Sequence, residues 1–273
     1  MMFETRRYRM TLEYDGTGFV GWQIQSNGRS VQEVLETALA DLFGIPVRVT
    51  GAGRTDAGVH AAGQAAHFDV ATKLSPTTIH RAVNARLPAD VTVLSLDEAP
   101  EGFHARFSAS SRTYIYTVRR RYSPLRRHVS WYVCGRLDRA RMQDAAALIP
   151  GTHRFTALSK HRDARDAGYC HVFEAVWIEQ GEELVFRIRA NRFLHGMVRA
   201  IVGALVRVGR GKFGVDAFRT VLEGKNAVDV PLVAPAQGLV LLEVRYDMEE
   251  RELVRVRMEQ LGKTMGGNAS MSC

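Results

Sequence analysis

The order of two hydrophobic periodicities constrains the fold more than any other feature of the sequence. In residues 8–14, apolar and polar side chains alternate with a period of two, which is typical of a half-buried strand. Residues 31–42 are predicted to be a helix, because Ser30 and Glu33 form a capping-box pattern and apolar residues follow at helical spacing. The same criteria predict strands at 46–50, 64–70 and 91–96 and a second helix at 76–87. The element order of the first half is therefore βαββαβ.

The same order of elements is predicted again after Phe107. The second half has expected strands at 113–119, 171–179, 183–190 and 238–246, a helix beginning at Asp138, and helices at 193–208 and 216–222. The halves show no visible sequence identity, so a chance repetition of the order is the alternative. Each half matches the ferredoxin-like, split βαβ pattern, and we expect an α+β protein whose two sheets join edge to edge. The predicted divisions are 1–107, 108–248, and a charged extension with a flexible tail at 249–273.

Composition and charge limit the classes of protein and of partner. The chain has 273 residues, of which 46% are hydrophobic and 24% charged, as in ordinary globular proteins. Its net charge of +8 favours a polyanionic partner such as nucleic acid, the alternative being a merely basic surface. Cys134, Cys170 and Cys273 are widely spaced, so neither a disulfide framework nor a zinc site is predicted. Without a secretory signal or a run long enough to span a bilayer, the protein is expected to be cytoplasmic, with no membrane partner.

Residues 51–61 (GAGRTDAGVHA) place one acid among glycines, between two predicted strands. The glycines allow sharp turns and close approach of a ligand to the main chain, although their spacing is not that of a phosphate-binding loop. Asp56, beside Arg54, is a candidate nucleophile or base. No second carboxylate stands nearby, as a glycosidase would require. The structural alternative is a turn capped by the side chains of Thr55 and Asp56.

Residues 103–117 (FHARFSASSRTYIYT) interleave basic and aromatic side chains. Arg106 and Arg112 suit contacts with phosphates, and the aromatic rings suit stacking on bases. Tyr114 and Tyr116 share one face of the predicted strand, so at least one of them is expected in the core.

Residues 190–214 contain an apolar helix face that is interrupted by Arg199. A guanidinium in such surroundings needs a carboxylate partner, either in a structural ion pair or on the glycine loop of the other half. Arg210 and Lys212, at the end of this helix, either interact with its dipole or bind phosphates.

Six segments resemble, in order and spacing, the tRNA pseudouridine synthase A family. The segments are YDGTGFVGWQIQ (14–25), SVQEVLETAL (30–39), GRTDAGVHA (53–61), FHARFSASSRTYIY (103–116), NRFLHGMVRAIVGAL (191–205) and APAQGLVL (234–241). The resemblance implies the pseudouridine synthase fold: two ferredoxin-like halves in one mixed, mainly antiparallel sheet with a central cleft. It also implies a homodimer that isomerises uridines 38, 39 and 40 of the tRNA anticodon stem-loop, without metal or organic cofactor.

The resemblance implies a role for several residues. Asp56 matches the catalytic aspartate of the family, and Arg199 the arginine that pairs with it. Tyr114 matches the tyrosine that stacks on the target uracil, Arg54 the arginine that assists base flipping, and Leu239 a substrate-binding position. Arg106, Arg112, Arg210 and Lys212 are expected to bind RNA. Whether the aspartate attacks the ribose, attacks the base or removes a sugar proton stays open.

Two positions depart from the family pattern. Gly196 stands where a second histidine is frequent, and Val240 where tyrosine is frequent. Two other functions remain as alternatives, a non-catalytic RNA-binding protein on ferredoxin-like modules and a nucleoside glycosidase. A binding module would need no carboxylate aimed at a substrate, and a glycosidase would release free uracil.

Overall fold

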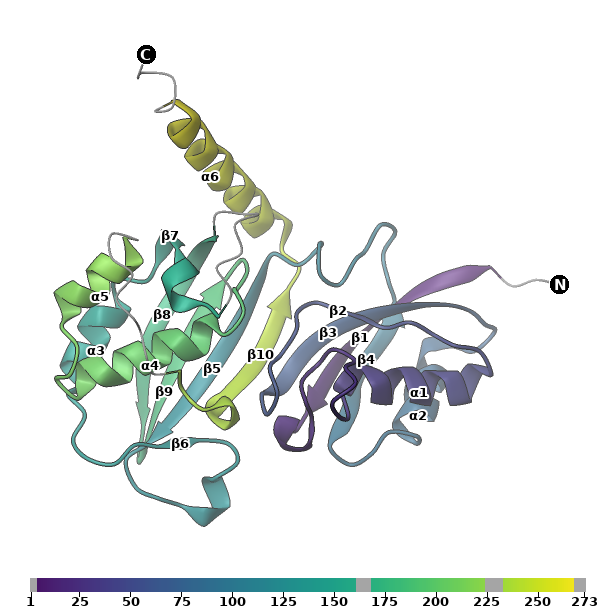
Figure 1. Cartoon of the computed structure of the whole chain (residues 1–273). Helices are drawn as coiled ribbons and strands as arrows, with labels where there is room; N and C mark the ends of the chain where they lie inside the picture. Colours follow the sequence, from purple (N-terminus) through teal and green to yellow (C-terminus); the bar gives the residue numbers. More distant parts are fainter. Residues whose placement is uncertain (1–3, 161–167, 224–232, 268–273) are drawn as a thin grey trace.

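A single mixed sheet runs through the whole protein. The computed structural model describes residues 4–160, 168–223 and 233–267. The strands of the sheet follow the order β4-β1-β3-β10-β5-β9-β8-β7, with β2 beside β3 and β6 beside β5. Helices α1 and α2 accompany the strands of the first half, and α3, α4 and α5 cover those of the second half (Figure 1). The expected α+β class is therefore confirmed.

The elements of the first half are β1 (Thr5–Tyr14), α1 (Val31–Phe43), β2 (Thr50–Gly51), β3 (His60–Ala71), α2 (Pro76–Asn84) and β4 (Val91–Glu98). Those of the second half are β5 (Ser111–Arg119), β6 (Trp131–Tyr132), α3 (Arg139–Ala146), β7 (Gly151–Arg154), β8 (Tyr169–Gln180), β9 (Glu183–Ala190), α4 (Met197–Gly209), α5 (Val215–Leu222) and β10 (Leu239–Arg245). A last helix, α6 (Met248–Gly267), extends away from the sheet (Figure 1). Among all the residues that the structure describes, no helix is long and apolar enough to cross a membrane.

The two halves repeat the same strand arrangement. In the first half β4, β1, β3 and β2 are neighbours in that order, and in the second β10, β5, β9 and β8 occupy the equivalent positions. The halves meet where β10 runs parallel to β3, pairing Val240 with His60 and Leu241 with Ala61. The long neighbouring strands within each half are antiparallel. The mixed, mainly antiparallel sheet was thus predicted correctly, while the domain boundaries and the central cleft stay predictions.

Local helix signals were reliable where the chain carries a cap. The side chain of Ser30 accepts the backbone N–H of Glu33 and completes the capping box, and Gly44 ends α1 with a φ of 69°. The side chain of Ser75 caps α2 by accepting the N–H of Thr78, and that of Asp138 caps α3 by accepting the N–H of Arg141. These interactions involve residues only a few positions apart, so the sequence alone encodes them.

Several predicted elements were wrong in their extent. The strand β3 begins at His60, four residues before the predicted start, and α2 ends at Asn84, three residues before the predicted end. In place of the expected strand at 46–50, only the two-residue strand β2 forms. The backbone of Val49 is hydrogen-bonded to side chains of α1 and not to another strand, since its N–H donates to Glu36 and its carbonyl accepts from Gln32. The helix expected from Phe193 begins instead at Met197, because Gly196 has a φ of 71°, outside the helical region. The short strands β6 and β7 were not predicted, since two to four residues carry no measurable periodicity.

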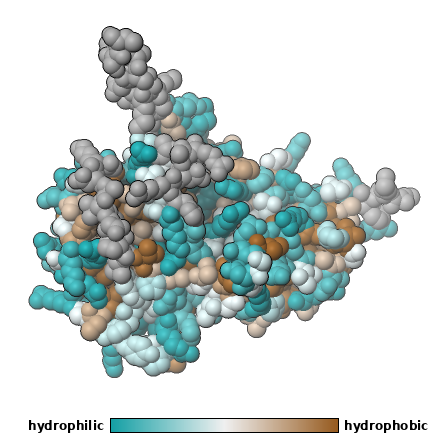
Figure 2. Space-filling model, in the orientation of Figure 1, coloured by the Kyte–Doolittle hydropathy of each residue, from teal (hydrophilic) through white to brown (hydrophobic). Residues whose placement is uncertain are grey.

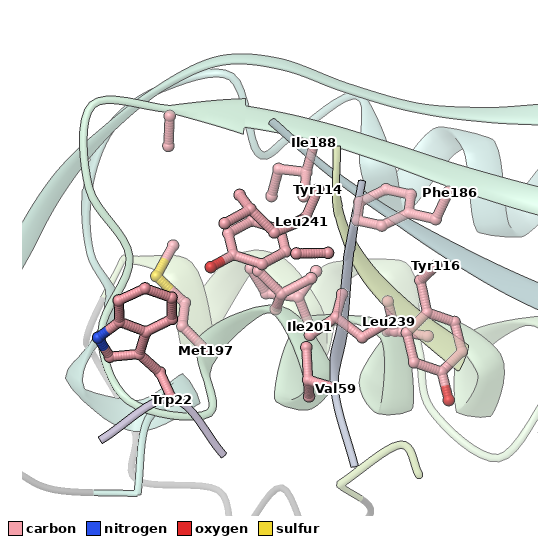
Figure 3. Packing of buried hydrophobic residues seen from close by; sticks show 14 of the residues in the cluster. Trp22, Val59, Tyr114, Tyr116, Phe186, Ile188, Met197, Ile201, Leu239 and Leu241 are labelled. Carbon is pink, nitrogen blue, oxygen red and sulfur yellow. The ribbon is translucent and has the colours of Figure 1, made fainter. Parts of the chain in front are cut away.

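One continuous hydrophobic core joins the two halves. Trp22 and Val59 of the first half belong to the same buried cluster as Tyr114, Ile201 and Leu241 of the second. Figure 3 shows these side chains lying together between the sheet and α4. Because protein cores are close-packed, this shared cluster fixes how the Asp56 loop of one half lies against α4 of the other.

The junction between β3 and β10 leaves no space for a side chain at Gly63. A Cβ atom added there would lie 2.3 Å from the carbonyl oxygen of Leu242. We therefore expect Gly63→Ala to push the two strands apart and to lower the free energy of unfolding by about 1–3 kcal/mol. Urea denaturation would measure this change. Gly53→Ala is the control, since a Cβ there meets nothing within 4 Å, and equal midpoints for the two variants would contradict the expectation.

Candidate active site

The loop that carries Asp56 is held on both sides by hydrogen bonds. The backbone N–H of Trp22 donates to the carbonyl of Thr55 at 3.1 Å, and the N–H of Val59 donates to the carbonyl of Asp56 at 3.1 Å. The buried hydroxyls of Thr55 and Tyr14 are 2.8 Å apart. The carboxylate therefore stands on a fixed backbone and is not carried by a loose turn.

Glycines allow the close packing of this loop. Gly21 lies opposite Asp56 with a φ of 111°, and a Cβ there would lie 2.6 Å from the carbonyl oxygen of Thr55. A Cβ at Gly51 would collide with the ring of Trp22. Within the loop itself Gly58 has a φ of 76°, a conformation that other residues rarely adopt.

Asp56 forms an ion pair with Arg199 across the two halves. The Arg199 Nη1 donates to Asp56 Oδ2 at 2.8 Å, and its Nε donates to the carbonyl of Ala234 at 2.8 Å. The side chain of Arg199 is 15% exposed and that of Asp56 is 20% exposed. Of the two interpretations of Arg199, the structure supports the one in which its partner is the acid of the glycine loop. The second hydrogen bond orients the guanidinium, so the pair is geometrically defined and still reachable from solvent.

His195 is a second basic side chain beside Asp56, and the sequence analysis missed it. Its Nε2 lies 3.2 Å from Asp56 Oδ1, and its side chain is 45% exposed. The left-handed turn at Gly196 separates it from α4, so His195 and Arg199 approach different oxygens of one carboxylate. Its only signal in the sequence was its position four residues before the arginine.

The two tyrosines of β5 occupy different environments. Tyr116 is fully buried, and its hydroxyl donates to the carbonyl of Pro235 at 2.8 Å, which makes it the core residue of the pair. Tyr114 is 8% exposed and packs edge-on against Phe193, with 5.1 Å between ring centroids. Burial raises the pKa of Tyr114, and the nearby charge of Asp56 raises it further. The phenol consequently keeps its proton at neutral pH and can donate a hydrogen bond.

Arg54 and Leu239 differ sharply in exposure. Arg54 is exposed, and its guanidinium has no ion pair or hydrogen bond with any residue that the structure describes. Leu239 is only 6% exposed and lies in the core cluster between Tyr116 and Ile201 (Figure 3). Arg54 is therefore available to an external partner, while Leu239 lies in the core beside the site.

The four basic residues expected to bind RNA fall into two groups. Arg106, Arg210 and Lys212 are exposed. The Arg106 guanidinium lies 5.7 Å from the ring centroid of Phe107, which is itself 66% exposed. This cation beside an exposed ring suits both a phosphate and a base.

Arg112 belongs to the other group, since its guanidinium is directed into the protein. Its Nη2 donates to the carbonyls of Ala52 and Arg106 at 2.9 and 2.8 Å, and its Nη1 donates to the carbonyl of Asn191 at 2.8 Å. Burial lowers the pKa of Arg112. The three carbonyls belong to the start of the Asp56 loop, the segment before β5 and the end of β9. Arg112 thus ties together the three parts of the chain that surround the site.

Comparisons with known proteins find similar sequences over most of the chain. Residues 10–108 and 145–247 match a family model described as tRNA pseudouridine synthase. The chain is 44% identical over 245 residues to the tRNA pseudouridine synthase A of Bacteroides thetaiotaomicron, covering 88% of this chain and 91% of that protein. It is 43% identical over 250 residues to that of Beijerinckia indica, covering 90% and 96%. The matched residues include Asp56 and Arg199, whereas Tyr114 lies between the two matched segments.

Removal of the Arg112 guanidinium should destabilise the protein. Arg112→Met leaves four backbone carbonyls, those of Ala52, Arg106, Ala109 and Asn191, without this donor, so we expect a loss of about 2–4 kcal/mol in the free energy of unfolding. Arg81→Met on the exposed face of α2 is the matched control, with an expected change below about 0.5 kcal/mol. Urea denaturation measures both. Equal stability of the two variants would show that the carbonyl contacts of Arg112 contribute little.

Proposed function

This chain belongs to the tRNA pseudouridine synthase family and isomerises uridine in tRNA, and on this premise we propose that its substrates are uridines 38, 39 and 40 of the anticodon stem-loop. We further propose Asp56 as the essential carboxylate. The observation that carries the proposal is the largely buried pair of Asp56 with Arg199, whose partners come from two different halves of the protein and lie 2.8 Å apart. A carboxylate that is largely buried, paired with a guanidinium and still reachable from solvent suits a functional site.

The reaction fits one positioned carboxylate. The bond between C1′ and N1 breaks, a bond between C1′ and C5 forms, the proton on C5 leaves, and N1 gains a proton, so no oxidant or reductant is needed. Asp56 acts on the nucleoside as a carboxylate, which Arg199 holds in place by its charge and by its hydrogen bond. Arg199 also limits the rotation of the carboxylate and so fixes its orientation for the reaction.

Three further residues have proposed contacts with the target nucleotide. Tyr114 stacks on the detached uracil and offers a protonated hydroxyl, in keeping with its raised pKa. Leu239 contributes an apolar contact at the side of the base. Arg54, which is exposed and unpartnered among the described residues, occupies the space that the flipped base leaves in the stem-loop.

RNA binding beyond the target nucleotide is proposed for Arg106, Arg210 and Lys212, whose exposed charges can reach phosphates. Arg112 was expected to join them. Because its guanidinium donates to backbone carbonyls inside the protein, we propose that it shapes the Asp56 loop instead. The homodimer, the cytoplasmic location and the independence from cofactors remain proposals that rest on the resemblance to the family.

The replacement Asp56→Asn tests the proposed function most directly. The amide keeps the shape of the side chain and removes its charge, so we expect at least about a 10³-fold loss of tritium release from tRNA labelled at C5 of uridine. The dissociation constant for tRNA should change less than about threefold, because phosphate contacts are spread over many basic residues.

Asp97→Asn is the matched control, because Asp97 is exposed on β4 and lies outside the site. It should retain full activity. Full activity of Asp56→Asn would overturn the assignment of the carboxylate. Tritium release by neither variant nor wild type would favour the non-catalytic RNA-binding protein, and free uracil in the wild-type reaction would favour the glycosidase.

A further inference from the structure

The connection between β5 and β6 carries an unusual density of positive charge. Residues 119–128 (RRRYSPLRRH), here named the basic arm, contain five arginines and no acid. The arm leaves the sheet at the end of β5 and projects from the lower edge of the second half (Figure 1). In the same orientation the surface at this edge is mostly hydrophilic (Figure 2). The sequence analysis did not assign a role to this segment.

Two glutamates of the β8–β9 hairpin hold the base of the arm. Glu183 forms ion pairs with Arg119 and Arg126, the latter at 3.0 Å, and is itself only 15% exposed. Glu179 forms an ion pair with Arg120 at 3.3 Å and with Arg139 of α3. Three of the arginines are thus used to fix the arm on the sheet, so its direction is set by the fold.

The remaining two arginines are directed to solvent. Arg121 and Arg127 are exposed, and neither forms an ion pair with a carboxylate among the residues that the structure describes. Arg127 Nη1 donates only to the carbonyl of Pro124, at 2.7 Å, a contact that leaves its charge uncompensated. The outer part of the arm is therefore a fixed surface with an excess of guanidinium donors, which match the geometry of phosphate groups.

Exposed aromatic and apolar side chains accompany these arginines. Tyr122 and Tyr132 are 58% and 42% exposed, and their rings meet edge-on with 5.7 Å between centroids. Leu125 is 92% exposed. Guanidinium groups interleaved with exposed rings suit single-stranded RNA, where bases and riboses are available for stacking. An acidic protein would satisfy the charge without giving the tyrosines a partner.

The end of the arm is connected to the loop that carries Asp56. The His60 Nε2 lies 2.8 Å from the carbonyl of His128 and is placed to donate to it, since its Nδ1 accepts the N–H of Gly16 at 3.1 Å. His60 is the first residue of β3 and follows Asp56 by four positions. The carboxylate of Asp15 lies 3.1 Å from His60 Nδ1 and is itself 57% exposed. The end of the basic arm is thus linked through His60 to the start of the strand that follows the Asp56 loop.

We propose that the basic arm is a phosphate-binding surface that holds the tRNA strand next to the reacting uridine. Arg121 and Arg127 contact the phosphates, and Tyr122 contacts an unpaired base or ribose. The proposal rests on the proposed function and extends it, since it places a second RNA contact outside the site built around Asp56. Because the arm is fixed by Glu179 and Glu183, it contributes affinity without the cost of ordering a flexible loop.

The double variant Arg121→Gln/Arg127→Gln tests the proposal. We expect the dissociation constant for tRNA to rise at least about tenfold at 0.1 M salt, because two phosphate contacts are lost. The slope of the logarithm of the association constant against the logarithm of the salt concentration should become shallower by about 1–2, since each phosphate contact releases about one counterion. Fluorescence anisotropy with full tRNA and with the isolated anticodon stem-loop measures both quantities. The same loss on the isolated stem-loop is expected, because the arm lies beside the Asp56 loop.

The double variant Arg6→Gln/Arg48→Gln is the charge-matched control. Both residues are exposed, at 52% and 75% of the side chain, and lie in the first half. This control should bind tRNA like the wild type. Unchanged affinity and salt slope in the arm variant would overturn the proposal, and so would a change of oligomeric state in sedimentation with unchanged RNA affinity, which would assign the arm to a second copy of the chain.

Tritium release by the wild type separates this proposal from the proposed function. If the wild type releases tritium and the arm variant binds tRNA normally, the arm proposal fails alone. If the wild type releases no tritium but the arm variant binds tRNA more weakly than the wild type, the proposed function fails and the arm remains an RNA-binding surface.

Discussion

The ion pair between Asp56 and Arg199 is the contact on which the rest of the site depends. Each partner comes from a different half of the chain, and both are more than three-quarters buried. Charges removed from water in this way are tolerated only when they are paired and hydrogen-bonded. Arg199 meets this condition by donating to both Asp56 and the carbonyl of Ala234. A small shift between the halves would separate the charges, so the pair requires a rigid connection between them.

Three features supply that connection. The parallel pairing of β3 with β10 joins the sheets, and Gly63 lets the two backbones approach more closely than a side chain would allow. The shared core under α4 fixes the distance between the Asp56 loop and the helix that carries Arg199. Arg112 then ties the loop to β9 and to the segment before β5. The geometry of the proposed site is therefore a property of the junction, and neither half contains it alone.

Arginines serve distinct purposes here, and their partners decide which. Arg199 orients a carboxylate, Arg112 binds carbonyls inside the protein, and Arg126 fixes the basic arm to Glu183. Arg54 and Arg121, which have no acidic partner among the described residues, are left for an external anion. The net charge of the chain indicates a polyanionic partner, but only the pairing within the fold shows which cations remain available to it.

The sequence by itself determined the features that depend on near neighbours. The capping box at Ser30, the alternation along β1 and the acid of the glycine loop are local patterns, and each was found where it was expected. The tertiary structure decided the features that depend on distant residues. The backbone of Val49 is hydrogen-bonded to side chains of α1 and is not part of a strand. The guanidinium of Arg112 donates to backbone carbonyls, and His195 lies beside Asp56. Hydrogen bonds form between donors and acceptors that the folded chain brings close together. Which residues of the two halves come close together is set by packing across the whole sheet.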